Sequence, residues 1–216
     1  QRNFVADVSH ELRTPLTTLR GNLGLLRRTP PIPAEEQADI LTDMVDESDR
    51  MIRLVNDLLV LARADAGRYL THEPLNLIPI LEEVGRLARQ LDSTRTIALD
   101  MPPEVEILGD RDAFKQVVLI LVDNALKHSQ GAVEITARQQ DQQVVVQVQD
   151  HGEGMTPEKL AHVFDRFYRG EDATTPGFGL GLSIAKSLVE GMGGTIGIES
   201  EVGKGSLVQL RFPPAE

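Results

Sequence analysis

The segment FVADVSHELRTPLTTLRGNLGLL, residues 4–26, contains a histidine and a glutamate side by side, His10 and Glu11. At about 100° per residue along an α-helix, the apolar residues of this segment form one stripe and His10 falls on the opposite side. The imidazole is therefore predicted to face solvent, with Thr14 one turn further along nearly the same face. An exposed neutral imidazole can act as a nucleophile. An exposed histidine without a chemical role is the plainer alternative.

A second candidate lies in QDHGEGM, residues 149–155, at the end of a predicted strand. Three valines of this strand alternate onto one face: Val144, Val146 and Val148. Asp150 continues the same face, and a buried carboxylate needs a hydrogen-bond donor, such as the exocyclic amine of adenine. Gly152 and Gly154 then allow a close approach of the backbone. A strand-ending aspartate followed by an ordinary turn is the alternative.

The helical segment DAFKQVVLILVDNALKHS, residues 112–129, places polar groups on one side. The polar side chains that cluster on this side of the helix are Gln116, Asp123, Asn124 and Lys127. An amide oxygen is a suitable Mg²⁺ ligand, and an ammonium three residues later could contact a metal-bound phosphate. A solvated polar face is the alternative. Ile120 is unexpected, because it is apolar yet lies in the middle of this face.

The segment PGFGLGLSIAKSL, residues 176–188, alternates three glycines before a predicted helix: Gly177, Gly179 and Gly181. Backbone N–H groups and the helix dipole at such a start favour phosphate oxygens. The preceding EDATTP is loop and not strand, so the segment is not a dinucleotide fingerprint. The Walker-like GKGS at residues 203–206 precedes no helix and is predicted as a hairpin turn.

Composition limits the function classes. The chain has 216 residues, a net charge of −11 and no cysteine, which excludes disulfides and thiol catalysis and argues against nucleic acid as a partner. No run of about eighteen apolar residues would span a membrane. Because the sequence lacks a start methionine, we expect a fragment of a longer protein. We expect this fragment to be soluble and cytoplasmic. A parent protein could be membrane-anchored only through missing N-terminal regions.

Two long amphipathic helices are predicted to position His10, at residues 1–28 and 34–66, separated by the proline-rich TPPIP. A lone hairpin cannot bury two broad apolar stripes, so we expect a homodimer that forms a four-helix bundle. Packing of the stripes against the rest of the chain is the alternative. The expected division is a helical domain 1–67, a linker 68–74 and a mixed domain 75–216.

The mixed domain is expected to be an α+β sandwich with a mostly antiparallel sheet. Helices are predicted at 77–91, 111–129 and from 182 onward. Strands are predicted at 96–102, 132–139, 143–150, 194–201 and 206–212.

The order of these motifs resembles the catalytic core of a sensor histidine kinase, over essentially the whole chain. The matching segments are SHELRTPLT, the helix with Asn124, Asp150-x-Gly-x-Gly, the paired-Phe VFDRFYRG and Gly-x-Gly-x-Gly-Leu. The resemblance implies a dimeric phosphotransfer hairpin followed by a Bergerat-type ATP-binding sandwich shared with gyrase. It also implies ATP and Mg²⁺ as cofactors and the receiver domain of a response regulator as partner.

The resemblance further implies a role for each motif residue. His10 corresponds to the phosphoacceptor, Glu11 to its general base, Thr14 to a residue that orients water for dephosphorylation of the regulator, and Arg169 to a charge stabiliser. Asn124 corresponds to the Mg²⁺ ligand, and residues 170–176 to a lid over ATP. The implied nucleotide site comprises Gln116, Asn124, Lys127, Asp150, Gly152, Gly154, Phe167, Gly177, Gly179, Leu180, Gly181 and Leu182.

Ile120 departs from the family pattern, which usually has a second Asn at this position. Its loss is expected to weaken Mg²⁺ or phosphate binding. In gyrase-like ATPases the same position carries the glutamate that activates water, and isoleucine cannot act as a base. An ATP-hydrolysing machine is therefore disfavoured, and a catalytically silent ATP-binding dimer that docks a partner is the other alternative.

Overall fold

The structure of the chain is a computed structural model that describes four stretches: 2–28, 31–65, 70–170 and 177–215. The chain divides into two compact units, Gln1–Val60 and Leu61–Glu216. Parts of three predicted segments lie outside the described residues: 29–30 of the interhelical loop, 68–69 of the linker and 171–176 of the lid.

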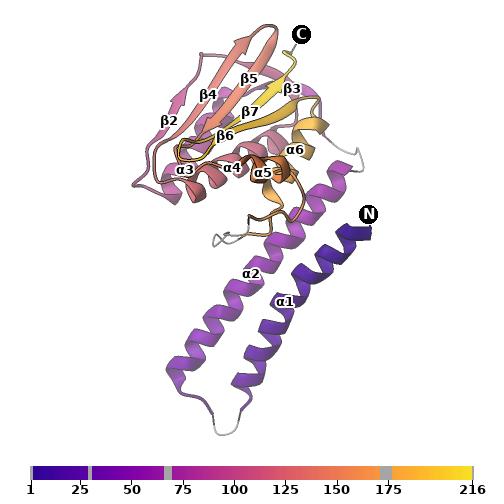
Figure 1. The fold of residues 1–216 in the computed structure, drawn as a ribbon, viewed down its shortest axis with the longest axis vertical. Helices are drawn as coiled ribbons and strands as arrows, with labels where there is room; N and C mark the ends of the chain where they lie inside the picture. Colours follow the sequence, from indigo (N-terminus) through magenta and orange to yellow (C-terminus); the bar gives the residue numbers. More distant parts are fainter. Residues whose placement is uncertain (1, 29–30, 66–69, 171–176, 216) are drawn as a thin grey trace. The chain divides into compact units, whose positions relative to one another are not determined.

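The first unit contains the predicted helical hairpin (Figure 1). Its helices are α1 (Arg2–Leu26) and α2 (Ala34–Asp65), which continues into the second unit. Pro15 lies inside α1 and is buried. Because proline has no N–H, the carbonyl of Glu11 lacks its helical partner, and α1 is locally weakened one turn after His10. None of the helices in the described parts of the chain is long and apolar enough to cross a lipid bilayer.

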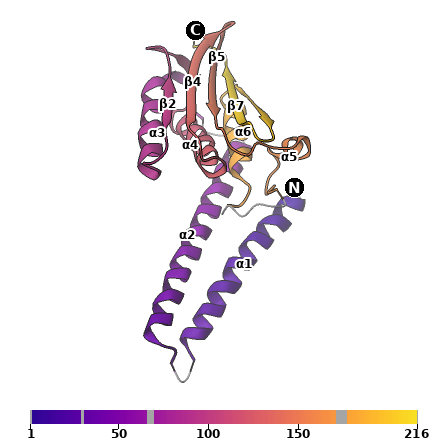
Figure 2. The ribbon, with the colours of Figure 1, turned by 60° about the vertical axis from the view of Figure 1, so that its left-hand side comes forward.

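The second unit is a two-layer sandwich of a five-stranded sheet and three helices (Figures 1 and 2). In sheet order the strands are β2 (Ile97–Asp100), β4 (Val133–Gln140), β5 (Gln143–Gln149), β7 (Gly205–Phe212) and β6 (Thr195–Glu201). The helices are α3 (Ile78–Leu91), α4 (Arg111–His128) and α6 (Gly181–Gly191). Among the strand pairs of the described residues, β2–β4 alone is parallel, so the prediction of a mostly antiparallel sheet is confirmed.

The core of this unit lies between the helices and one face of the sheet. The three valines predicted to share one face of β5, Val144, Val146 and Val148, are all buried, and Val145 on the other face is buried as well. On α4 and β7, the rings of Phe114 and Phe212 meet edge to face with centroids 6.0 Å apart. Asp150 follows β5 on the buried face, as the sequence predicted.

Three short elements were missed by the sequence analysis. Strands β1 (Glu73–Asn76) and β3 (Glu106–Gly109) form a separate antiparallel pair, and β1 begins inside the predicted linker 68–74. Helix α5 (Pro157–His162) lies in a stretch predicted as loop. Thr156 caps α5 and proline occupies its first turn, a helix-start signal that the sequence did offer. Four-residue strands are too short to show a clear alternation.

Asp110 joins the start of α4 to the chain that precedes β1. Its carboxylate accepts hydrogen bonds from the N–H groups of Asp112 and Ala113 at 3.0 and 2.9 Å, and from the N–H and hydroxyl of Thr71 at 3.2 and 3.1 Å. Partial burial acts to raise the pKa of Asp110, but these donors, chiefly the N–H of Ala113, outweigh it and hold the pKa below its ordinary value.

Replacing Asp110 with alanine should therefore destabilise the chain by about 1–2 kcal/mol at pH 7, the usual cost of losing an N-cap. Because the folded pKa lies below the unfolded value, the ionic part of this contribution exists above the unfolded pKa and disappears as pH falls through the folded pKa. Urea unfolding near neutral pH and at about pH 3 measures both effects. Asp110→Asn, which keeps the cap, is the control. Equal losses in the two variants would contradict the capping role.

Candidate functional site

The first candidate group is the exposed face of α1 around His10. His10 and Thr14 are exposed and Glu11 is half-buried, as the helical period predicted for the histidine. Within the described stretches, the side chains of His10 and Glu11 make no hydrogen bond or ion pair, so both are available for chemistry with a group brought to this face.

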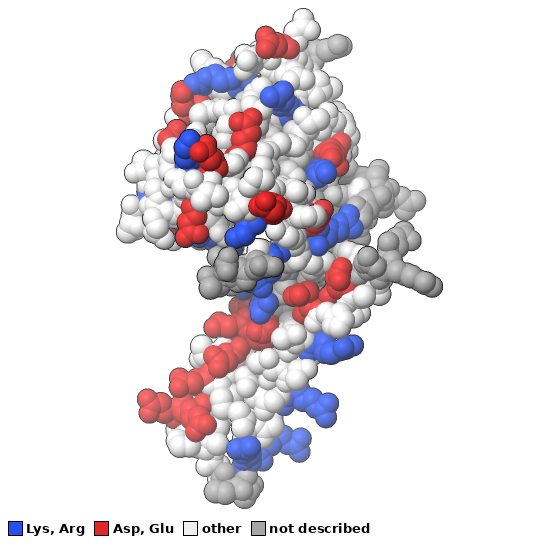
Figure 3. All heavy atoms as spheres, viewed as in Figure 1, with Lys and Arg blue, Asp and Glu red and all other residues white. Residues whose placement is uncertain are grey.

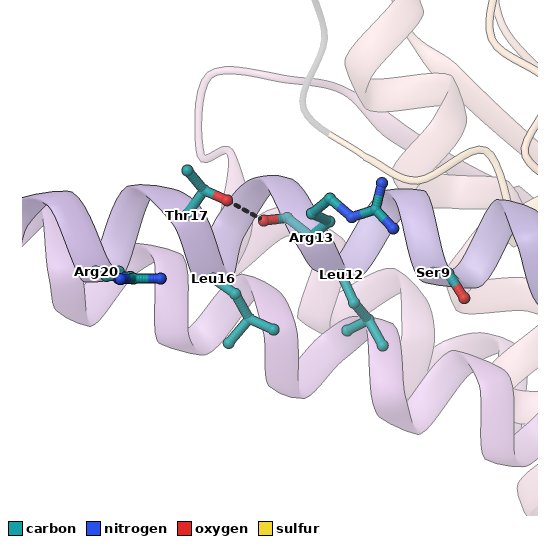
Figure 4. A pocket seen from close by; sticks show the side chains of 6 residues that line it. All are labelled: Ser9, Leu12, Arg13, Leu16, Thr17 and Arg20. Carbon is teal, nitrogen blue, oxygen red and sulfur yellow. Dashed lines mark hydrogen bonds between the residues drawn. The ribbon is translucent and has the colours of Figure 1, made fainter.

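A shallow hollow lies on the same helix, and its lining includes Ser9, the residue before His10 (Figure 4). It is lined by Ser9, Leu12, Arg13, Leu16, Thr17 and Arg20. The Thr17 hydroxyl donates to the carbonyl of Arg13 at 2.8 Å, which keeps this polar group bonded within the helix. The hollow therefore presents leucine side chains with two arginines beside them.

The second candidate group centres on Asp150, whose side chain is only 8% exposed. Oδ1 accepts a hydrogen bond from the N–H of Gly152 at 2.8 Å. Within the described stretches, Oδ2 accepts none. Because Asp150 is largely buried, a carboxylate oxygen without a protein donor is suited to a ligand that supplies an N–H.

The glycines after Asp150 approach the chain's own backbone closely. A Cβ at Gly152 would lie 2.0 Å from the carbonyl oxygen of His128, the last residue of α4. Gly154 has φ +66°, and a Cβ there would lie 2.0 Å from the carbonyl oxygen of Glu201. The predicted close approach is thus present at both positions, and it fits the turn tightly against α4 and β6.

Helix α4 places the predicted metal and phosphate groups beside the start of α6. Asn124 is half-buried, and within the described stretches its amide makes no hydrogen bond. The Nζ of Lys127 lies 2.5 Å from Oδ2 of Asp123, an exposed ion pair that a phosphate could replace. Gln116 is half-buried about two turns earlier on α4.

The packing of α6 explains why the apolar Ile120 lies on this polar face of α4. A Cβ at Gly181 would lie 3.2 Å from Cγ2 of Ile120, so the start of α6 packs over this side chain. The contact is one turn before Asn124 on α4. Within the described residues no side chain caps the N-terminus of α6, so its first N–H groups can bind an anion.

The glycine-rich segment before α6 rests on the paired-Phe segment. Gly179 has φ +68°, and a Cβ there would lie 2.5 Å from the carbonyl oxygen of Tyr168. Phe167 itself has φ +62°, an uncommon backbone conformation for a bulky residue. On α6, the Nζ of Lys186 lies 5.7 Å from the ring centroid of Phe164. These contacts hold the two segments together.

The remaining predicted nucleotide residues differ in exposure. Leu180 is 1% exposed and belongs to the core, whereas Leu182 is half-buried and Gly177 is exposed. Leu180 can therefore support the loop but presents almost no surface to a ligand. Arg169 is exposed and lies directly before the part of the lid that is outside the described residues.

The sequence analysis missed one residue that packs against Asp150, Gly205. The turn containing GKGS is a hairpin between β6 and β7, as predicted, but Gly205 also lies against the Asp150 backbone. A Cβ at Gly205 would be 2.1 Å from the Asp150 carbonyl oxygen, and the N–H of Asp150 donates to the carbonyl of Ser206 at 2.9 Å. The sequence did offer a signal for this contact, because Gly205 is a residue type that permits a close approach of two backbone segments.

Comparison with known proteins assigns a family to each part of the chain. Residues 1–67 match the family described as "His Kinase A (phospho-acceptor) domain". Residues 109–216 match the family described as "Histidine kinase-, DNA gyrase B-, and HSP90-like ATPase". The fold and the site therefore define a phosphoacceptor hairpin joined to an ATPase-type domain.

Curated relatives agree with this class. The signal transduction histidine-protein kinase/phosphatase MprB of Mycolicibacterium paratuberculosis is 37% identical over 211 residues, covering 94% of this chain and 40% of the relative. BaeS of Escherichia coli, a signal transduction histidine-protein kinase, is 36% identical over 209 residues, covering 91% of this chain and 43% of the relative. The chain thus spans less than half the length of these relatives.

Solved structures give the same result. Full-length ShkA in complex with AMPPNP has a TM-score of 0.74 and 32% identity, covering 99% of this chain and 46% of that chain. The mycobacterial sensor histidine kinase MprB has a TM-score of 0.61 and 26% identity, covering 67% of this chain and 98% of that chain. The chain belongs to the sensor histidine kinases of two-component systems.

Proposed function

We propose that this chain is the catalytic core of an autokinase that binds ATP, phosphorylates His10 and passes the phosphoryl group to an aspartate of a response regulator. The observation that carries the proposal is the largely buried Asp150, one carboxylate oxygen of which accepts no hydrogen bond in the described stretches, in a chain that also exposes His10 beside Glu11. The proposed domains are a phosphotransfer domain 1–67, a linker 68–74 and an ATP-binding domain 75–216. We place this core in the cytoplasm, where ATP is available.

In the proposed nucleotide site, Oδ2 of Asp150 accepts a hydrogen bond from the exocyclic amine of adenine. The N–H groups at the start of α6 and the Lys127 ammonium bind phosphate oxygens, and the segment from Gly177 to Leu182 lies along them. Phe167 shapes the opposite wall through its contact with Gly179.

Mg²⁺ fits the residues present. The amide oxygen of Asn124 is a hard ligand without a protein partner in the described stretches, and Mg²⁺ is commonly held by one or two protein oxygens together with substrate phosphates. When bound there, the ion would neutralise charge on the phosphates.

In the proposed transfer, a ring nitrogen of His10 attacks the γ-phosphorus and the bond to the bridging β–γ oxygen breaks, so that ADP leaves. Glu11 takes the proton that the imidazole ring loses. Arg169 stabilises charge on the phosphoryl group during transfer. In the phosphatase reaction, Thr14, on nearly the same face as His10, orients a water molecule that hydrolyses the aspartyl phosphate of the regulator and releases inorganic phosphate. The printed name of MprB includes both activities.

The hairpin supports the proposed homodimer. Several α2 side chains are large, apolar and exposed: Leu41, Val45, Ile52, Val55 and Leu59. Their spacing follows a repeat of three and four residues, which is typical of helices that pack against other helices. Val5, Leu16 and Leu23 of α1 are exposed in the same way. A second copy would cover these side chains in a four-helix bundle.

The response regulator is proposed to dock on the hairpin just below His10, on the polar side of α1 that the second copy leaves uncovered. Figure 3 shows basic side chains along α1 and acidic side chains along α2. Arg13 and Arg20 lie at the hollow, and the first turns of α2 contain Glu35, Glu36, Asp39, Asp43, Asp46 and Glu47. A partner that fits both helices needs a surface with both charges.

Incubation of the chain with γ-labelled ATP and Mg²⁺ tests the proposed function. We expect a protein-bound label that is labile in acid and stable in base, as for a phosphoramidate. ATP binding without any label would contradict the autokinase and favour a silent ATP-binding dimer. Steady release of phosphate without labelled protein would favour an ATPase.

Restoring an amide at position 120 should strengthen Mg²⁺-ATP binding. In Ile120→Asn a second oxygen lies one turn from Asn124, and a net gain of one hydrogen bond corresponds to roughly 2–10-fold in affinity. Isothermal titration of ATP with and without Mg²⁺ measures the change in affinity. Ile120→Val is the control for packing against Gly181. Weaker binding by the Asn variant would show that the apolar contact with α6 matters more than the added ligand.

A further inference from the structure

A half-buried arginine outside all the motifs, Arg95, binds the backbone at the end of α4 and in the loop that follows it. It lies in the loop between α3 and β2. Its Nε donates to the carbonyl of Gly131 at 2.9 Å, and its Nη1 to the carbonyls of Ser129 at 2.8 Å and Leu126 at 3.4 Å. Its Nη2 donates to the Ser129 hydroxyl oxygen at 2.7 Å. One guanidinium thus fixes the end of α4 and the loop that follows.

Further hydrogen bonds fix both Ser129 and the loop that carries Arg95. The Ser129 hydroxyl, which is buried, donates to the carbonyl of Ala125 at 2.8 Å. On the other side, Oδ1 of Asp92 accepts from the N–H and hydroxyl of Thr94 at 3.0 and 2.6 Å, which shapes the loop before Arg95. The cation also lies at the C-terminus of α4, where the helix dipole favours positive charge.

The segment that Arg95 holds, residues 126–131, is the segment on which the Asp150 turn rests. The carbonyl oxygen of His128 would be 2.0 Å from a Cβ at Gly152, and the Cβ of His151 would be 3.2 Å from a Cβ at Gly131. Gly152 in turn donates its N–H to Oδ1 of Asp150. A shift of residues 126–131 would therefore move the turn that orients this carboxylate.

We propose that Arg95 is a positioning residue for purine recognition, which fixes residues 126–131 so that the Asp150–Gly152 turn keeps Oδ2 aimed at the exocyclic amine of the base. The inference rests on the function proposed above, in which Asp150 accepts that amine. Arg95 touches neither the nucleotide nor the phosphate groups in this account and acts only through the backbone.

The test compares Arg95→Ala with Arg89→Ala in the whole chain, by ATP and GTP titration and by urea unfolding. Arg89 is the matched control, because its Nη2 donates one hydrogen bond to the carbonyl of Ile97 at 2.9 Å, on the neighbouring strand. Arg89→Ala should lower stability yet keep the wild-type affinity and the wild-type preference for ATP over GTP. Arg95→Ala should weaken ATP binding by about tenfold and reduce that preference, since small displacements of recognition groups are costly.

Arg95→Lys covers the case in which the alanine variant does not fold. Lysine keeps the charge but cannot reach several acceptors with a planar fork, so the preference for ATP over GTP should still fall. Folded Arg95 variants with wild-type affinity and preference would overturn the inference. A wild-type chain that binds neither nucleotide would instead overturn the proposed function on which the inference rests.

Discussion

Replacing His10 with glutamine should abolish phosphorylation of the chain while leaving ATP binding unchanged. The imidazole nitrogen is the proposed nucleophile, and a glutamine amide nitrogen has no available lone pair to attack phosphorus. His10 is exposed and its side chain makes no hydrogen bond in the described stretches, so the variant should fold normally, with a stability change within about 0.5 kcal/mol. Labelling with γ-labelled ATP and a parallel ATP titration measure the two properties.

His72→Gln is the matched control for this experiment. His72 is also an exposed histidine, and its Nδ1 contacts only the carbonyl of Leu70, at 3.1 Å, among the described residues. We expect normal labelling in this variant. Equal labelling of the His10 variant and the wild type would contradict the assignment of the phosphoacceptor.

Replacing Asp150 with asparagine should weaken ATP binding by about one to two orders of magnitude, the range expected for a hydrogen bond to a charged group. Asparagine keeps the size of the side chain and an oxygen for the N–H of Gly152. Its amide nitrogen would then face the exocyclic amine of adenine, donor against donor. Labelling of His10 should fall with nucleotide occupancy and recover in part at high ATP concentration.

Asp141→Asn is the control for the lost negative charge. Asp141 is exposed in the turn between β4 and β5 with φ +49°, a conformation that asparagine also adopts readily. Its ATP affinity should equal that of the wild type. If the Asp150 variant bound ATP equally well, the proposed adenine site would be wrong.

Local periodicity was sufficient to predict the directions of the main candidate side chains. The helical period alone predicted that His10 faces solvent, and strand alternation alone predicted that Asp150 is buried. Both depend on neighbours within a few residues, which a sequence displays directly. The hairpin and the mixed sandwich followed from the same patterns and from the resemblance to histidine kinases.

Contacts between distant segments could not be predicted in this way. The sequence showed Ile120 as an apolar residue on a polar face, and only the packing of α4 against Gly181 explains it. Likewise the sequence predicted a close approach of the backbone at Gly152, but it could not show that the neighbour is the carbonyl of His128. Arg95 has no motif, because its role depends on carbonyl groups, which any residue type supplies.

The most direct test of the central claim is to locate the phosphoryl group after incubation of the wild-type chain with Mg²⁺-ATP, by fragmentation mass spectrometry under neutral to alkaline conditions. The account predicts one modified residue, His10, although the hydroxyls of Ser9 and Thr14 lie nearby on α1. Phosphate on either hydroxyl, or a chain that binds ATP and remains unmodified, would contradict the account.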